Sequence, residues 1–352
     1  MTSELDDFHA VIPAGGAGTR LWPLSRAGRP KFLLDLDDSG RTLIQHTWDR
    51  LRALVPPERI HVVTGAAHAA AIREQLPDLV NVLVEPSPRN SMPAIGWAAA
   101  TIAATDPSAV IGSFAADHVI TGDAAFADAI TQAVATARTG LVTTIGITPT
   151  DPSTAFGYIR ADTALDVPGA PSAVAIEAFV EKPDVATAQS YLAAGGYTWN
   201  AGMFVVGAEV LLGHLARLQP TLADGLRAIA ADPAELDAIW PSLTSIAIDH
   251  AVAEPVSLEG GMAVVPGTFG WDDVGDFAAL ETLRGSDPNT LFVDADGLAI
   301  SDDDTLVAVL GLRDVVVVRT ADALLVTTRE HAQRVGEIPK TLKNDLGRPD
   351  LT

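Results

Sequence analysis

Short apolar runs alternate with longer segments of helical periodicity along the first two-thirds of the chain. In segment 42–55, for example, Leu43, Thr47, Leu51 and Leu54 recur at the spacing of one helical face. Such alternation is typical of βαβ units with right-handed crossovers. We therefore predict an α/β fold with a doubly wound, mainly parallel, Rossmann-like sheet. The predicted strands lie at 10–13, 60–64, 80–84, 110–114 and 141–147, and the predicted helices at 42–55, 67–76, 94–104 and 125–137.

In a sheet of this kind, ligands bind in the crevice beyond the carboxyl ends of the strands. The loops that follow the predicted strands are therefore the first places to look for a binding site. These loops are 14–31, 85–91, 115–118 and 148–157.

The pattern changes from about Asn289 onward. Short β-type runs are separated by aspartate and glycine, and no helical segment lies between them. We expect a small β-rich, β-helix-like C-terminal domain, so that the chain divides into domains 1–285 and 286–352. The β-type runs are 291–293, 305–310, 314–319 and 323–327.

Composition narrows the class of protein. With 352 residues, 48% hydrophobic and 19% charged, the chain can bury a large core. No apolar run approaches the ~18 uncharged residues of a membrane helix, and the acidic N-terminus lacks the features of a signal peptide. The net charge of −22 disfavours nucleic acid and anionic membranes as partners. The absence of cysteine excludes thiol chemistry and suits a cytoplasmic protein.

One segment departs from this acidic character. Segment 20–31 contains no acidic residue but has four basic ones, Arg20, Arg26, Arg29 and Lys31. In a strongly acidic protein, such a segment indicates an anion-binding site.

This basic segment continues a glycine-rich loop that follows the first predicted strand. Glycines at this position let backbone amides approach a polyphosphate, whose charge Arg20 and Lys31 would neutralise. The loop residues that we expect to bind a nucleotide are Ala14, Gly15, Gly16, Gly18 and Thr19.

Other interpretations of the loop compete with this one. A plain glycine-rich turn is as probable from the glycines alone. A dinucleotide fingerprint would need a third glycine where Leu21 stands, although Asp35 and Asp37 lie near the expected distance for a ribose partner. A Walker loop would need Gly-Lys-Ser or Gly-Lys-Thr after the glycines, and no such tripeptide follows.

The loop and its continuation, residues 15–26 and 30–33, resemble the nucleotide-binding opening of sugar-1-phosphate nucleotidylyltransferases. The Leu-Trp-Pro-Leu-Ser-Arg stretch at 21–26 is most similar to that of mannose-1-phosphate guanylyltransferases, or GDP-mannose pyrophosphorylases. The resemblance covers roughly residues 8–335 and continues in order through further motifs. These motifs are 85–90, 115–118, 156–159, 179–183, 199–204, 248–252 and 270–275.

The resemblance implies a reaction and a metal. GMP would pass from GTP to mannose 1-phosphate by in-line attack, without a covalent enzyme intermediate. Asp117 and Asp273 would hold Mg²⁺, for which carboxylate oxygens are suitable ligands. The family pattern places the ligand at Asp273 and not at Asp272. Together with Arg20 and Lys31, the two aspartates are the expected catalytic residues.

Substrate recognition involves a second group of residues. The resemblance implies that Glu181 and Asn200 bind sugar hydroxyls, that Lys182 meets the sugar phosphate, and that Gly157 allows close backbone approach. For the base, we expect Glu85 to accept from the two donors of guanine, N1–H and the N2 amine. The loop around Asn90 is the next candidate.

Three alternatives stay open from the sequence. The enzyme could use another sugar 1-phosphate or another nucleoside triphosphate, or the chain could be a non-catalytic regulatory subunit that binds a nucleotide sugar. The dinucleotide-binding interpretation of the glycine-rich loop would make the protein a dehydrogenase, and a titration with NAD(H) would test it. Because the chain ends without the extra isomerase domain of some relatives, we expect no phosphomannose isomerase activity. The sequence is compatible with a homo-oligomer and does not specify one.

Overall fold

The computed structural model describes residues 4–16 and 18–352, which form two compact units. The first, the sheet unit, comprises the residues up to Gly15 together with Trp48–Ala115 and Ile120–Trp271. The second, the loop unit, comprises Gly16–Thr47, Ala116–Val119 and Asp272–Thr352. Each unit is therefore built from three separate stretches of chain.

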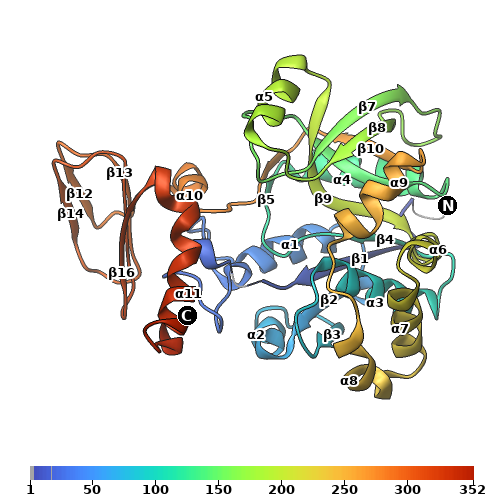
Figure 1. Cartoon of the computed structure of the whole chain (residues 1–352), viewed down its shortest axis with the longest axis horizontal. Coiled ribbons are helices and arrows are strands. Elements are labelled where there is room, and N and C mark those ends of the chain that lie inside the picture. The colour runs from blue at the N-terminus through green and yellow to red at the C-terminus, as the bar shows by residue number, and fades with distance from the viewer. Residues whose placement is uncertain (1–3, 17) are drawn as a thin grey trace. The chain divides into compact units, whose positions relative to one another are not determined.

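The sheet unit contains a nine-stranded sheet with the strand order β3-β2-β1-β4-β9-β6-β10-β8-β7 (Figure 1). All five predicted strands are present, as β1, β2, β3, β4 and β6. The strands are β1 Phe8–Ala14, β2 Ile60–Gly65, β3 Asn81–Glu85, β4 Val110–Ser113, β6 Val142–Ile147, β7 Tyr158–Ala164, β8 Val174–Val180, β9 Tyr197–Gly207 and β10 Met262–Gly267.

The sheet is mixed. Strands β3, β2, β1 and β4 pair in parallel, as do β6 and β10, as expected for a doubly wound α/β fold. Strand β9 lies antiparallel between β4 and β6, and β8 and β7 continue the sheet antiparallel from β10. The predicted parallel arrangement thus holds for the N-terminal strands, whereas the strands from residues 158–207 add antiparallel pairs.

Buried helices cover the sheet. Nearly every residue of α3 is buried, and α3 packs against α6 and α7. Burial of apolar surface contributes about 25 cal/mol per Å², so this cluster is a major part of the core. The helices of the sheet unit are α2 Ala66–Gln75, α3 Ser91–Ala103, α4 Asp123–Ala137, α5 Val185–Ala194, α6 Ala208–Leu218, α7 Pro220–Ala231, α8 Leu236–Ile239 and α9 Glu254–Leu258; α1, Leu43–Arg52, begins in the loop unit and ends in the sheet unit.

The C-terminal part of the loop unit is β-rich, as predicted. Strand β12 pairs in parallel with β14, and β13 with β15, so that successive turns of chain stack as in a β-helix. Strand β16 closes this stack antiparallel to β15 (Figure 1). The elements are α10 Phe277–Arg284, β12 Thr290–Val293, β13 Gly297–Ser301, β14 Val307–Leu310, β15 Val315–Arg319, β16 Leu324–Thr328, the 3-10 helix η7 Arg329–Gly336, α11 Glu337–Asn344 and the 3-10 helix η8 Pro349–Leu351.

The loop unit has a hydrophobic core of its own, to which both an N-terminal segment and the C-terminal β-rich strands contribute. Leu21 and Trp22, next to the glycine-rich loop, are buried in one cluster with Leu298, Ile300 and Val316 of the β-rich stack. The β-rich segment from residue 286 therefore shares its compact unit with residues 16–47. Strands β5, Val119–Thr121, and β11, Gly270–Asp272, pair with each other and contain points at which the chain passes from one unit to the other.

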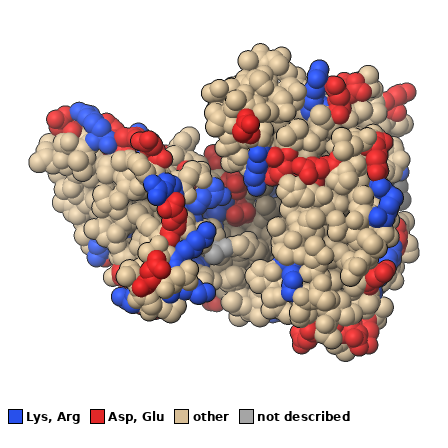
Figure 2. Space-filling model, in the orientation of Figure 1, with Lys and Arg blue, Asp and Glu red and all other residues tan. Residues whose placement is uncertain are grey.

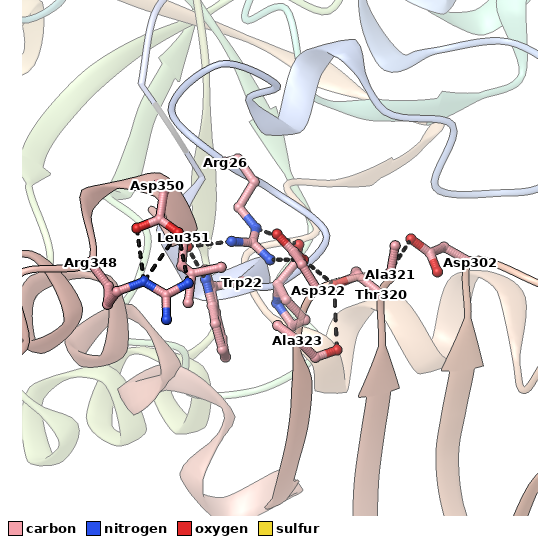
Figure 3. A network of polar contacts seen from close by, with 11 residues as sticks. Trp22, Arg26, Asp302, Thr320, Ala321, Asp322, Ala323, Arg348, Asp350 and Leu351 are labelled. Atoms are coloured by element: carbon pink, nitrogen blue, oxygen red, sulfur yellow. Dashed lines mark hydrogen bonds and ion pairs between the residues drawn. The ribbon is translucent and has the colours of Figure 1, made fainter.

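Polar contacts fasten the segment after the glycine-rich loop to the last residues of the chain (Figure 3). The Trp22 indole Nε1 donates to the Leu351 carbonyl at 2.7 Å, and the Ala27 amide donates to the Thr352 carbonyl at 3.1 Å. The Arg26 guanidinium also donates to the Leu351 carbonyl and pairs with Asp322 at 2.8 Å. The conformation of residues 22–27 thus depends on residues 322–352.

The hydropathy of the helices and the charges on the surface are as the composition predicts. Among the described residues, no helix is both long enough and apolar enough to cross a bilayer. Acidic side chains are spread over the face shown in Figure 2, and basic side chains lie among them.

Candidate active site

Lys31 forms the centre of a charged cluster in the loop unit. It opens the 3-10 helix η2, Lys31–Leu33, and is almost fully buried. Its Nζ lies 3.0 Å from Asp117 Oδ2 and 3.3 Å from Asp273 Oδ1, and it also donates to the Asp273 carbonyl. Burial by itself would lower the pKa of Lys31, but the charges of the two carboxylates outweigh it and raise this pKa above its usual value. The lysine is therefore held as a cation between the two aspartates.

Local backbone geometry makes this cluster possible. Gly18 has φ +60°, and a Cβ placed on it would lie 2.5 Å from Lys31 Cβ. Only glycine lets the loop cross Lys31 so closely. Asp272 turns its Oδ1 to the Val274 amide at 2.6 Å and holds the turn, whereas the neighbouring Asp273 faces Lys31. Adjacent aspartates thus have different tasks.

Asp117, His118 and Asp273 could hold a divalent cation. One ligand atom from each of these residues lies within 4.8 Å of those of the other two. His118 Nε2 is 3.7 Å from Asp273 Oδ1. Burial opposes the charge of Asp273, but Lys31 and then His118 lower its pKa below the usual value. Two carboxylates suit a hard cation such as Mg²⁺, and the His118 imidazole offers a nitrogen ligand beside them.

Arg20 lies in the same unit and extends from the 3-10 helix η1, Thr19–Leu21. A Cβ on Gly275 would lie 3.4 Å from Arg20 Nη1, so this glycine leaves room for the guanidinium beside the turn that carries Asp273. Of the predicted triphosphate-binding loop, Ala17 lies outside the described residues. Gly16 has φ +86°, and the Ala14 carbonyl accepts from Thr64 Oγ1 at 2.8 Å.

Glu85 is a buried carboxylate at the end of β3 in the sheet unit. The residue is only 7% exposed, and its Oε2 has no hydrogen-bond partner among the described residues. Burial raises the pKa of Glu85 to about 7. A Cβ on Gly15, at the start of the glycine-rich loop, would lie 3.9 Å from Glu85 Oε1. A buried acceptor without a partner is uncommon in a native protein and is explained if a ligand supplies the donor.

Asn90, which we expected near the base, has a structural task. Its side-chain Oδ1 accepts from the Ser91 amide at 2.8 Å and caps α3. This bond uses the oxygen of the side-chain amide and leaves the nitrogen as its polar atom for a ligand.

The predicted sugar-binding residues lie together in the sheet unit. The Asn200 amide donates to the Gly157 carbonyl at 2.8 Å. A Cβ on Gly157 would lie 2.6 Å from Glu181 Oε2, so glycine is required for this approach. Lys182, whose side chain is largely exposed, pairs with Glu181 Oε1 at 3.2 Å. These four residues therefore form one cluster.

Two further residues, Thr144 and Asp249, complete this cluster. Asn200 Oδ1 accepts from Thr144 Oγ1 at 2.7 Å and from the Gly202 amide at 3.1 Å, while its Nδ2 donates to Asp249 Oδ1 at 3.1 Å. Burial, and then the charge of Glu181, raises the pKa of Asp249 to about 6. Asn200 is thereby oriented as a donor to any ligand. The motif around Asp249 was visible in the sequence, but nothing there indicated its partner.

The structure thus gathers the predicted residues into two groups that belong to different units. The loop unit holds the phosphate- and metal-type residues Arg20, Lys31, Asp117 and Asp273. The sheet unit holds the recognition-type residues Glu85, Gly157, Glu181, Lys182 and Asn200. A buried lysine between two carboxylates and a glycine-rich loop after the first strand of an α/β sheet are features suited to a phosphorylated ligand.

Comparison with known proteins identifies the family to which the chain is similar. Residues 9–288 match the nucleotidyl transferase family, and residues 288–342 match the MannoseP isomerase/GMP-like beta-helix domain. The xanthan biosynthesis protein XanB of Xanthomonas campestris pv. campestris is 38% identical over 99% of this chain and 76% of its own length. The mannose-1-phosphate guanylyltransferase ManC of Salmonella typhimurium is 36% identical over 96% of this chain and 74% of its own length.

A solved structure is similar over nearly the whole chain. A crystal structure from Thermus thermophilus, named as a mannose-1-phosphate geranyltransferase, has a TM-score of 0.85 and 32% identity over 96% of this chain and 99% of that one. The chain belongs to the nucleotidyl transferase family, with a C-terminal β-helix-like domain.

Proposed function

We propose that this protein transfers GMP from GTP to mannose 1-phosphate and forms GDP-mannose and pyrophosphate. The observation that carries the proposal is the buried Lys31 held between Asp117 and Asp273, in a chain whose relatives include proteins named as mannose-1-phosphate guanylyltransferases. In this cluster Lys31 would supply positive charge to the phosphates, and the two carboxylates would supply oxygen ligands to a divalent cation.

The chemistry follows from these charges. An oxygen of the sugar phosphate attacks the α-phosphorus of GTP, a new P–O bond forms, and the bond to the bridging oxygen of the β-phosphate breaks, so that pyrophosphate leaves with the electron pair. The nucleophile is already anionic and needs no general base. Arg20 and Lys31 would bind and orient the triphosphate and stabilise the charge that develops on it. Mg²⁺, held by Asp117 and Asp273 with His118 beside them, would neutralise further phosphate charge.

Recognition of the two substrates would depend on the sheet unit. Glu85 offers a buried acceptor to the N1–H and N2 donors of guanine, and adenine has no such pair of donors. Glu181 and the donor face of Asn200 would bind hydroxyls of the sugar, and Lys182 its phosphate. In this proposal residues 1–285 carry both substrates and residues 286–352 are an accessory domain. The protein acts in the cytoplasm, without a nucleic acid or membrane partner, as a monomer or homo-oligomer.

A steady-state assay of pyrophosphate release tests the proposal. We expect turnover with GTP, mannose 1-phosphate and Mg²⁺, and none in EDTA. The assay should include other nucleoside triphosphates and glucose 1-phosphate. Another pair with at least a tenfold higher kcat/KM would overturn the substrate assignment. Absence of turnover with every pair would favour a regulatory subunit that binds a nucleotide sugar.

A further inference from the structure

The C-terminal region contacts the nucleotide loop through a side chain that neither the family nor the proposed function accounts for. The 3-10 helix η7 packs against η1, which carries Arg20. A Cβ on Gly336, the last residue of η7, would lie 3.3 Å from both Arg20 Cγ and Thr19 Oγ1. Glycine at this position therefore allows η7 to come close to the loop.

From η7, Gln333 reaches the Arg20 side chain. Arg20 Nη1 donates to Gln333 Oε1 at 2.9 Å. The other end of the same amide, Gln333 Nε2, donates to Asp276 Oδ2. Asp276 is buried and caps α10, because its Oδ1 accepts from the Ala278 and Ala279 amides at 2.8 and 3.1 Å. Because a guanidinium can only donate, the Gln333 amide directs its oxygen at Arg20, and the bond from its nitrogen to Asp276 Oδ2 holds it in this orientation.

The choice of a neutral acceptor matters for a phosphate-binding arginine. A guanidinium has five N–H donors, and this contact uses one of them. A carboxylate at the position of Gln333 would neutralise much of the charge that a triphosphate needs, whereas an amide oxygen holds the guanidinium and leaves its charge in place. The arrangement therefore orients Arg20 without competing with an anionic ligand.

We propose that Gln333 is a positioning residue for Arg20, through which the β-helix-like C-terminal region takes part in binding the triphosphate of the nucleotide. This inference rests on the proposed function, in which Arg20 binds GTP. It assigns to the C-terminal region a part in the affinity for nucleotide, exerted through Arg20, in addition to its part in the fold of the loop unit.

Gln333→Met tests the proposal, because methionine keeps the length of the side chain and removes both hydrogen bonds. The loss of one hydrogen bond to a charged group should raise the KM for GTP roughly three- to tenfold. The KM for mannose 1-phosphate should change less than twofold. The matched control is Arg334→Met on the same 3-10 helix, where Arg334 pairs with Glu337 at 3.0 Å, and it should leave both KM values unchanged.

A double-mutant cycle separates positioning from a general structural effect. If Gln333 acts through Arg20, Gln333→Met should have no further effect on the KM for GTP in an Arg20→Met background. Effects that multiply in the double variant, or an unchanged KM in Gln333→Met, would overturn the proposal. Thermal unfolding of each variant checks the fold, and Gln333→Ser serves as a second variant if methionine packs badly.

Calorimetric titration with GTP and Mg²⁺ distinguishes this inference from the proposed function. If the parent protein turns over no substrate pair but binds GTP, the proposed function fails, and a weaker affinity of Gln333→Met for GTP still supports the positioning role. If the parent protein is active and Gln333→Met binds GTP as tightly as the parent, the positioning role alone fails.

Discussion

The two units treat their charged residues in opposite ways. In the loop unit, Lys31 sits between two carboxylates, whose charges raise its pKa, and Arg20 has an amide partner. In the sheet unit, Glu85 is a buried acid and Asp249 a half-buried one; desolvation raises the pKa of Glu85 to about 7 and, together with the charge of Glu181, that of Asp249 to about 6. The two carboxylates of the loop unit thus have a cation beside them. In the sheet unit, Glu85 Oε2 has no hydrogen-bond partner among the described residues, which is typical of a group that recognises a ligand.

The largest effect should come from the carboxylate pair of the loop unit. Asp117→Asn and Asp273→Asn conserve size and remove a charged metal ligand, so each should lower kcat/KM by roughly 10²-fold or more. Asp272→Asn is the control, because Asp272 holds the turn to Val274, and its cost should stay below about tenfold. Steady-state kinetics at saturating Mg²⁺ measure all three. A larger loss from Asp272 than from Asp273 would reverse the assignment of the ligand.

In the sheet unit, Glu85→Gln should impair selection of the base. The KM for GTP should rise about tenfold, because the amide presents a donor to guanine where the carboxylate presents an acceptor. ITP lacks the N2 amine, so the parent protein should prefer GTP to ITP, and the variant should discriminate less between them. Competition kinetics with the two triphosphates measure this ratio. If the ratio and the KM are those of the parent, guanine is recognised elsewhere, and the loop around Asn90 would be examined next.

The raised pKa of Glu85 predicts a pH dependence of GTP binding. Guanine binds the ionised carboxylate, so affinity for GTP should fall as the pH drops below about 7, and Glu85→Gln should remove this dependence. The same pKa shift has the opposite effect on the stability of the folded protein, which should fall as the pH rises. A folded pKa above the usual value of 4.5 stabilises the fold at pH below 4.5, and this contribution is lost as the pH rises through about 7. Glu85→Gln should therefore melt at a higher temperature than the parent protein at pH 8, and at about the same temperature at pH 4. Equal melting temperatures at pH 8 would show that Glu85 is solvated.

The smallest effect should come from Asp249, which acts on the sugar through Asn200. Asp249→Asn should raise the KM for mannose 1-phosphate roughly three- to fivefold, since the Asn200 amide loses a charged acceptor but keeps its bonds to Thr144 and Gly202. The KM for GTP should stay within twofold. A change in both values of equal size would mean that Asp249 supports the fold of the sheet unit and has no particular link to the sugar.

Local patterns in the sequence predicted the first half of the sheet because apolar periodicity is a local signal. The same is true of the glycine-rich loop, whose residues take conformations that only glycine accepts, as Gly18 does above Lys31. Strand β9 was missed because Asn200 and Gly202 interrupt its apolar run, and its place between β4 and β6 is set by tertiary pairing. The helix α11 was missed as well, because it is only eight residues long and contains Pro339, a residue that disfavours helix interiors.

The division of the chain into units could not be predicted, for a related reason. Leu21 and Trp22 belong with Leu298, Ile300 and Val316, and nothing in the local sequence of either segment specifies a partner so far along the chain. The site was predictable as a set of residue types at the ends of strands. Partners such as Gln333 for Arg20 were not, because they depend on packing between the two ends of the chain.

The three-part construction of the loop unit has a consequence for synthesis on the ribosome. All residues of the sheet unit have been translated once Trp271 is added, so that unit can fold while the chain is still growing. Gly16–Thr47 are made early, yet the partners that bury Leu21 and Trp22 are made last. A nascent chain with a folded sheet unit would therefore hold Glu85 and Asn200 in place while Arg20 still lacks Gln333 and Lys31 still lacks Asp273. The surroundings of Arg20 and Lys31 are completed only by residues that are made after Trp271.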